Sequence, residues 1–236
     1  MEIRADQIKR DLKEAARDCS PKDCDFVVRY LGTKRKFLNV KSPERDKILR
    51  EASKQINVLS SVEVAKFLDD LILSDTFEYV NFAGKLMSKS KKAREAVTFG
   101  RLEKWLAKTT GWAECDSICQ SLYSEEEVLA MFDDWEKFIN RFSQSKNIQI
   151  RRASLVLQCK PTRESRDAKL RTLAFETIEK LKGENGALIT KAVSWLLRSL
   201  SVKNGAEVFK YLKTNQSSLP RIAYRETMRK IETGKK

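Results

Sequence analysis

Trp112 and Asp116 are the two residues of this 236-residue sequence whose types and spacing most directly suggest chemistry. A separation of four places both side chains on adjacent turns of one helix face. Cys115, Ile118 and Cys119 form an apolar stripe in the same segment, so Asp116 lies at the edge of an apolar surface beside an indole. Desolvation there disfavours the ionised carboxylate unless a cation lies near, as at many catalytic sites; the alternative is a boundary Asp that caps the helix or pairs with a lysine.

Two later segments combine arginine with features that suit phosphate or base contacts. Arg152 is followed by the small residues Ala153 and Ser154, which would let a phosphate approach its guanidinium closely. Trp195 and Arg198 are three residues apart in a largely apolar helical segment. The alternatives are an ordinary surface arginine at 152 and a core tryptophan at 195, with Arg198 at the rim.

The positive charge of the chain is concentrated toward the C-terminus. Its 47 basic and 33 acidic residues give a net charge of +14. Residues 1–150 hold 27 basic and 25 acidic side chains, a net of +2, whereas residues 151–236 hold 20 and 8, a net of +12. A surplus of positive charge confined to one part of the chain indicates a surface that faces a polyanion, most plausibly nucleic acid. The alternative is a solvated basic face that only aids solubility.

The composition excludes several classes of protein. Without histidine there is no Ser-His-Asp triad, no Cys-His pair and no histidine-ligated metal site, and we expect neither a metal nor a cofactor. Only 8 Gly and 4 Pro argue against an all-β fold, which needs many turns. Neither a dinucleotide-binding nor a phosphate-loop glycine motif is present.

The same sequence carries no sign of export or of a membrane segment. No stretch approaches the roughly 20 apolar residues of a membrane helix, and the charged N-terminus is not a signal peptide. The five cysteines are scattered without a Cys-x-x-Cys pattern. We therefore expect reduced thiols in a cytoplasmic protein. If the basic surplus after residue 150 faces DNA, we expect the protein to associate with the nucleoid when it is bound to DNA.

Apolar residues recur at helical spacing almost throughout, and no sustained alternation indicates strands. The pattern predicts helices over residues 2–17, 22–31, 43–58, 61–73, 76–88, 90–108, 112–122, 125–142, 147–157, 165–181, 186–200, 203–214 and 220–232. Capping-box spacing supports three of the starts, at Ser60/Glu63, Asp75/Glu78 and Ser124/Glu127.

The order of these helices predicts the architecture. The segment 158–164, with Pro161, is predicted to be a loop where the basic part begins. No Gly/Ser- or Pro-rich linker divides the chain. We therefore predict a single all-α domain over residues 1–236, an α-solenoid of stacked antiparallel helical repeats.

Four segments in order resemble the AlkD-like family of DNA alkylation repair glycosylases. They are the N-terminal segment 30–49, the Trp-x-x-x-Asp-Ser-Ile segment 112–118, the Arg-Ala segment 147–153 and the Lys-Ala-x-x-Trp-x-Leu-Arg segment 191–198. The resemblance implies HEAT-like repeats with a concave basic cleft that grips DNA without a base-flipping pocket. The chain departs from the family pattern at Asn39, Lys41, Gly111 and Gln149. The resemblance implies that Gly is common at the first position, Gln occurs in some relatives at the second, an aromatic residue is frequent at the third, and Trp is common at the fourth.

The resemblance also implies a role for each matching residue. Asp116 would be the catalytic carboxylate, Trp112, Trp195 and Tyr30 would contact the lesion, and Arg152, Arg198 and Lys41 would bind the DNA backbone. The implied reaction is hydrolysis of the N-glycosidic bond of cationic N3- or N7-alkylated purines in duplex DNA, by a monomer without a membrane partner. The rival hypotheses are a non-catalytic HEAT-like module that binds DNA or RNA, and a helical scaffold for acidic proteins.

Overall fold

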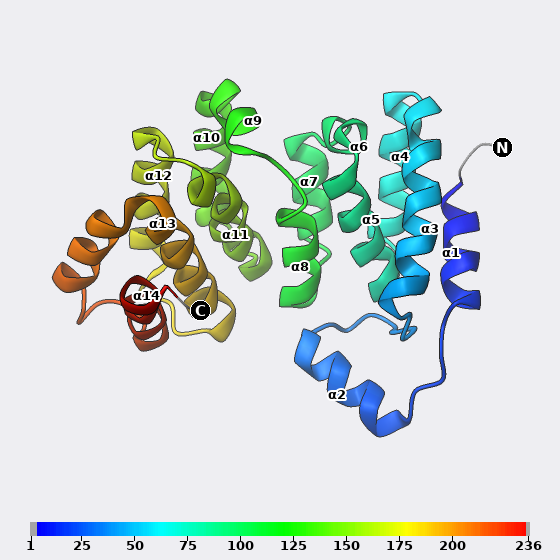
Figure 1. Ribbon diagram of the computed structural model, residues 1–236, viewed down its shortest axis with the longest axis horizontal. Helices are drawn as coiled ribbons and strands as arrows, with labels where there is room; N and C mark the ends of the chain where they lie inside the picture. Colours follow the sequence, from blue (N-terminus) through cyan, green and yellow to red (C-terminus); the bar gives the residue numbers. More distant parts are fainter. Residues whose placement is uncertain (1–3, 235–236) are drawn as a thin grey trace. The chain divides into compact units, whose positions relative to one another are not determined.

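The computed structural model describes residues 4–234, and Figure 1 shows that helices make up its elements. Among these residues there are 14 α-helices, one short 3-10 helix and no strand; the backbone pairing of Lys36 with Thr76 is an isolated bridge. The all-α fold class predicted from the sequence is confirmed. The chain divides into two compact units, Met1–Leu122 and Tyr123–Lys236, which are described one at a time. A single domain over residues 1–236 stays a prediction.

The first unit is organised around α5. Its helices are α1 (Ala5–Glu14), α2 (Pro21–Leu31), α3 (Ser42–Gln55), α4 (Ser61–Ile72), α5 (Phe77–Lys89), α6 (Lys91–Glu95), α7 (Phe99–Leu106) and α8 (Trp112–Cys119), with the 3-10 turn η1 (Ile56–Val58) after α3. Helix α5 packs against α3, α4, α6 and α8. By contrast, α2 buries none of its residues. The helix that carries Trp112 and Asp116 therefore rests on the centre of this unit.

The second unit is organised around α11 and α13. Its helices are α9 (Glu125–Ala130), α10 (Phe132–Ser143), α11 (Ile148–Glu164), α12 (Ala168–Leu181), α13 (Ala187–Thr214) and α14 (Arg221–Thr233). Helix α11 packs against α9, α10, α12 and α13, and α14 packs against α13. Trp135 and Phe142 of α10 are fully buried in its core.

Two of the three predicted capping boxes are present. Ser60 accepts a hydrogen bond from the Glu63 amide at the start of α4 while Glu63 bonds the Ser60 amide, and Ser124 and Glu127 do the same at α9. Such reciprocal bonds satisfy two amides that the helix itself leaves unpaired. The third prediction, at 75 and 78, is wrong, because α5 begins after Thr76 and Glu78 bonds another segment instead.

The predicted loop at 158–164 is also wrong, because α11 continues to Glu164 with Pro161 inside it. Pro161 is buried, and an interior proline costs about 3 kcal/mol. Buried contacts of neighbouring residues offset this: Gln158 donates to the Thr177 hydroxyl of α12 at 3.0 Å, and Thr162 donates to the Gln158 carbonyl at 2.6 Å. Long-range packing thus extends a helix that the proline was expected to end.

Two other predicted helices are divided in the structure. The helix expected at 90–108 is divided into α6 and α7, because Thr98 caps a new start by accepting from the Arg101 amide. The helix expected at 125–142 is divided at Met131, which has φ −128°. The predicted division between the helices at 186–200 and 203–214 is confirmed, because α13 consists of two helical stretches on either side of a kink at Asn204, whose backbone is not helical.

The cysteines differ from the prediction in one respect. Cys19 and Cys24 form a disulfide at the start of α2, where their Cα atoms are 5.8 Å apart, within the usual range for a bridge. The expectation of five reduced thiols is therefore wrong for this pair. The remaining three, Cys115, Cys119 and Cys159, are buried free thiols. Of the helices in residues 4–234, none combines the length and the apolar character that crossing a membrane requires.

Candidate functional site

Helix α8 places Trp112 and Asp116 one turn apart, as the sequence predicts. The apolar stripe of the same helix is buried: Cys115 and Ile118 are 0% exposed and Cys119 is 1% exposed. Trp112 and Asp116 are both half-buried. The indole and the carboxylate therefore lie at the margin between the core and the surface of the first unit.

Tyr30 and Trp112 form an aromatic corner at the start of α8, one helical turn before Asp116. The Trp112 Nε1 donates to the Tyr30 carbonyl oxygen at 2.7 Å, and the two rings meet edge to face with centroids 5.6 Å apart. This T-shaped arrangement is a favoured geometry for aromatic pairs. Tyr30 remains 66% exposed, so its ring offers a large open face. The structure thus brings together Tyr30 and Trp112, two residues to which the family resemblance assigns lesion contact.

Two glycines make this corner possible. Gly32, which ends α2, has a φ of 66°, a conformation that favours glycine. A Cβ at Gly111 would lie 2.3 Å from the Gly32 carbonyl oxygen. The departure from the family pattern at Gly111 therefore has a steric reason, since no larger side chain fits against this backbone. Sequence reasoning missed Gly32, although a glycine directly after a predicted helix is a known C-cap signal.

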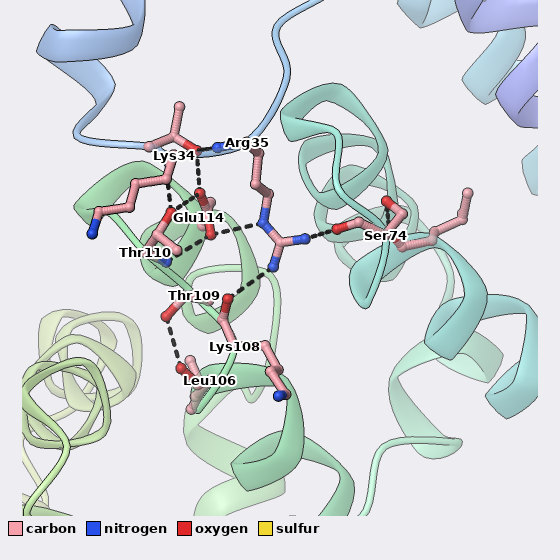
Figure 2. Close-up of polar contacts among 10 residues, drawn as sticks. Lys34, Arg35, Ser74, Leu106, Lys108, Thr109, Thr110 and Glu114 are labelled. Atoms are coloured by element: carbon pink, nitrogen blue, oxygen red, sulfur yellow. Dashed lines mark hydrogen bonds and ion pairs between the residues drawn. The ribbon is translucent and has the colours of Figure 1, made fainter.

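A buried carboxylate on α8 fixes the segment that follows α2 (Figure 2). Glu114 is fully buried and accepts hydrogen bonds from the Thr33 hydroxyl, from Arg35 Nε at 3.0 Å, and from both the amide and the hydroxyl of Thr110 at 2.9 Å. A buried charge is tolerable only when it is paired and its lone pairs are satisfied. Both conditions hold for Glu114, which therefore joins the start of α8 to residues 33–35.

Arg35 extends this network to two further elements (Figure 2). Its guanidinium donates to the Ser74 carbonyl after α4 and, through Nη2 at 3.0 Å, to the Lys108 carbonyl after α7. The side chain is 8% exposed. No local sequence pattern singles out Arg35, and only tertiary packing reveals that it is an internal cross-link.

A second buried carboxylate, Glu78 of α5, holds the same segment further along. It accepts the amides of Leu38 at 3.0 Å and Asn39 at 2.9 Å. Burial raises the pKa of Glu78 above 4.5, and these amides partly oppose the rise. Asn39 has a φ of 56°, a left-handed conformation that favours glycine and that asparagine tolerates, which fits the departure from the family pattern at this position. The exposed Lys41 donates through Nζ to the Asn39 side-chain oxygen at 3.2 Å.

Helix α8 also lies unusually close to α5. A Cβ at Gly84 would be 2.3 Å from the Ser117 carbonyl oxygen, so only glycine permits this approach. Asn81, one turn earlier on α5, donates through Nδ2 to the Ser117 hydroxyl at 3.0 Å. These contacts hold the residue that follows Asp116. No motif in the sequence singles out Gly84, since its importance comes from the neighbouring helix.

The predicted arginines of the second unit are engaged in internal contacts. Arg152 is 4% exposed, and its Nη1 donates to the Leu188 carbonyl of α13. Arg198 pairs through Nη1 with Glu226 of α14 and with the Ser194 hydroxyl. Both guanidinium groups thus join helices of this unit, and their contact with DNA stays a prediction.

The seven predicted site residues are shared between the two units. Tyr30, Lys41, Trp112 and Asp116 lie in the first, whereas Arg152, Trp195 and Arg198 lie in the second. Trp195 is half-buried, so part of its indole reaches the surface of its unit. Gln149, one of the departures from the family pattern, is buried. Among the described residues, no group of three or more Cys, Asp or Glu side chains could hold a metal ion.

The site on α8 offers a carboxylate and aromatic faces. A carboxylate stabilises a developing positive charge nearby, and an aromatic face attracts a cation. With no histidine in the chain, the site lacks the usual proton shuttle at neutral pH. This set of groups suits a reaction on a substrate that already carries positive charge.

Comparisons with known proteins agree with the resemblance seen in the sequence. The family model described as DNA alkylation repair enzyme matches residues 8–231. A solved structure described as a predicted DNA alkylation repair enzyme from Enterococcus faecalis has a TM-score of 0.71 with this chain at 18% identity. The match covers 90% of this chain and 96% of the other, which shows a shared fold. In the comparison with curated proteins, no sequence matches significantly.

Proposed function

Since the chain belongs to the DNA alkylation repair enzyme family, we propose that it is a DNA glycosylase for cationic alkylated purines. The substrates would be 3-methyladenine and 7-methylguanine type lesions in duplex DNA, released by hydrolysis of the N-glycosidic bond. The observation that carries the proposal is the pairing, on α8, of a half-buried Asp116 with the corner of Trp112 and Tyr30.

Alkylation at N3 or N7 of a purine makes the base a good leaving group without protonation. As the bond to the sugar breaks, positive charge develops at the anomeric carbon. Asp116 stabilises this oxocarbenium-like sugar electrostatically or orients the attacking water. No histidine is needed for either task, which fits a chain that has none.

The aromatic residues recognise the cationic nucleotide. A cation over an indole face gains about 0.5–2 kcal/mol, more as the contact is desolvated. Trp112, with Tyr30 beside it, and Trp195 from the second unit supply such faces. Lys41 is an exposed cation on the segment held by Glu78, which supports a backbone phosphate contact. Arg152 and Arg198 complete the proposed backbone contacts.

The second candidate is a non-catalytic module that binds nucleic acid, favoured by the surplus of +12 in residues 151–236. The presence of the carboxylate at 116 favours the enzyme. A non-catalytic module would bind damaged DNA and leave every base in place, whereas a glycosylase would release the alkylated base.

Release of the free base distinguishes the two candidates and tests the choice of substrate. Duplexes with a single 7-methylguanine, 3-methyladenine or hypoxanthine are incubated with excess protein, and the released base is quantified. We expect release of the two cationic bases and little of neutral hypoxanthine, because only the former leave without protonation. Equal release of all three would contradict the mechanism, and binding without any release would support the module.

A further inference from the structure

A basic cleft of about 730 Å³ lies in the second unit, where α13 ends and α14 begins. Three cationic side chains, Lys213, Arg221 and Arg225, line it together with the hydroxyl groups of Thr214, Ser217 and Tyr224. None of the described residues that line the cleft is acidic. Its volume falls within the ~300–1,000 Å³ typical of ligand sites. None of these residues belongs to the site on α8, which is in the first unit.

The three cations of the cleft have no acidic partners. Within residues 4–234, no ion pair or side-chain hydrogen bond engages Lys213, Arg221 or Arg225, and Lys213 lies only over an aromatic ring, Phe209, at 5.3 Å. By contrast, Arg151, Arg171 and Arg198 of the same unit each pair with a glutamate. The cleft therefore gathers positive charge that the protein leaves uncompensated.

This arrangement is unfavourable in the free protein. Arg221 and Arg225 are one turn apart at the start of α14, and like charges at this spacing repel each other. The positive end of the helix dipole also disfavours cations there. The first turn has no acidic residue, and Pro220 provides no capping side chain. An anion bound in the cleft would reduce the repulsion between the two arginines, interact favourably with the helix dipole and accept hydrogen bonds from the uncapped first turn of α14.

We propose that this cleft binds backbone phosphates of the DNA duplex on which the protein acts, as an anchoring contact separate from the lesion site. The inference rests on the proposed function for the identity of the DNA. Guanidinium groups bind phosphate in bidentate fashion, and Lys, Ser, Thr and Tyr side chains are common phosphate donors. Because phosphates carry no base identity, the contact adds affinity without regard to sequence or lesion.

The test is the salt dependence of binding to undamaged duplex DNA. The variant Lys213→Gln/Arg221→Gln/Arg225→Gln removes the three charges from exposed positions. Each phosphate contact contributes about −0.9 to the slope of log K against log salt, so three lost contacts make the slope shallower by up to about 2.7. Raising salt from about 50 to 200 mM would then weaken wild-type binding about 40-fold more than binding of the variant.

A second triple variant, Lys137→Gln/Lys169→Gln/Lys180→Gln on α10 and α12, removes the same charge elsewhere on the unit. We expect it to retain the wild-type slope. Equal effects of the two variants would show a general charge effect and overturn the proposal, as would an unchanged slope in the cleft variant. Binding of pyrophosphate to wild type and to the cleft variant is measured in parallel. If the cleft variant loses pyrophosphate binding but keeps the wild-type salt slope for DNA, the cleft binds a free phosphate ligand, and the proposal is overturned.

Base release separates this inference from the proposed function. At saturating protein, the cleft variant should release 7-methylguanine at the wild-type rate, while half-saturation needs more protein. A lower rate at saturation would show that the cleft is more than an anchor and contradict the proposal. If wild type releases no base, the proposed glycosylase activity is refuted. The salt slopes of DNA binding would still test whether the cleft binds backbone phosphates.

Discussion

Replacement of Glu114 by glutamine should destabilise the protein far more than the same change at a surface glutamate. Glu114 is fully buried, and its partner Arg35 is 8% exposed. In Glu114→Gln, the guanidinium would keep only neutral carbonyl acceptors. Removal of one member of a buried ion pair costs about 3–5 kcal/mol, because the other charge is left without its counter-ion. This is a large part of the ~5–15 kcal/mol that stabilises a typical domain.

The assay is urea unfolding of the full chain, followed by circular dichroism. Glu51→Gln is the matched control: Glu51 pairs with Lys54 at 3.0 Å on the surface, where both side chains are more than half exposed (60% and 73%). Such pairs contribute about 0–1 kcal/mol. A double variant that also changes Arg35 to Met should recover part of the loss, because the uncompensated cation is gone. Equal losses in Glu114→Gln and Glu51→Gln would refute this account of the network.

Three other changes test the support of the site. Gly84→Ala should lower stability and base release, because its Cβ would lie 2.3 Å from the Ser117 carbonyl oxygen, whereas Gly100→Ala, with open space around it, should stabilise by about 0.4–1 kcal/mol; equal unfolding midpoints would be evidence against the close α5–α8 contact. Burial raises the pKa of Glu78 in the folded protein, so its carboxyl group loses its proton at a higher pH in the folded than in the unfolded chain, and the free energy of unfolding of the wild type should fall as the pH rises from 4.5 to the raised pKa. This fall should be absent from Glu78→Gln, and parallel curves of unfolding free energy against pH for the two proteins would contradict the prediction. Trp112→Phe should cost about 0.5–1.5 kcal/mol by losing the 2.7 Å bond to the α2 carbonyl, measured by urea unfolding, and no loss would disprove that bond.

Local patterns predicted the helices and most of their starts correctly. The capping boxes at Ser60 and Ser124 depend on neighbours three residues away, and a sequence shows these directly. The continuation of α11 through Pro161 depends on the bond between Gln158 and Thr177 of α12. No local rule reveals such a partner, so the proline was read by its local preference alone.

The same distinction applies to the site. The pairing of Trp112 with Asp116 follows from helical spacing and is visible in the sequence. The bond between Arg35 and Glu114 joins residues 79 apart, and that between Arg198 and Glu226 joins residues 28 apart. Sequence reasoning therefore found the residues of α8 but neither of these two ion pairs, because only the fold brings the partners together.

The rate of 7-methylguanine release under single-turnover conditions, compared between wild type and Asp116→Asn, tests the central claim most directly. Asp70→Asn, an exposed carboxylate on α4, serves as the control for loss of one charge. Removing a preorganised electrostatic contact from a transition state typically costs about 10²–10³ in rate. We expect a loss of that size in Asp116→Asn, with DNA affinity retained and the control unaffected. An Asp116→Asn protein that releases the base at the wild-type rate would contradict the assignment of Asp116 as the catalytic carboxylate.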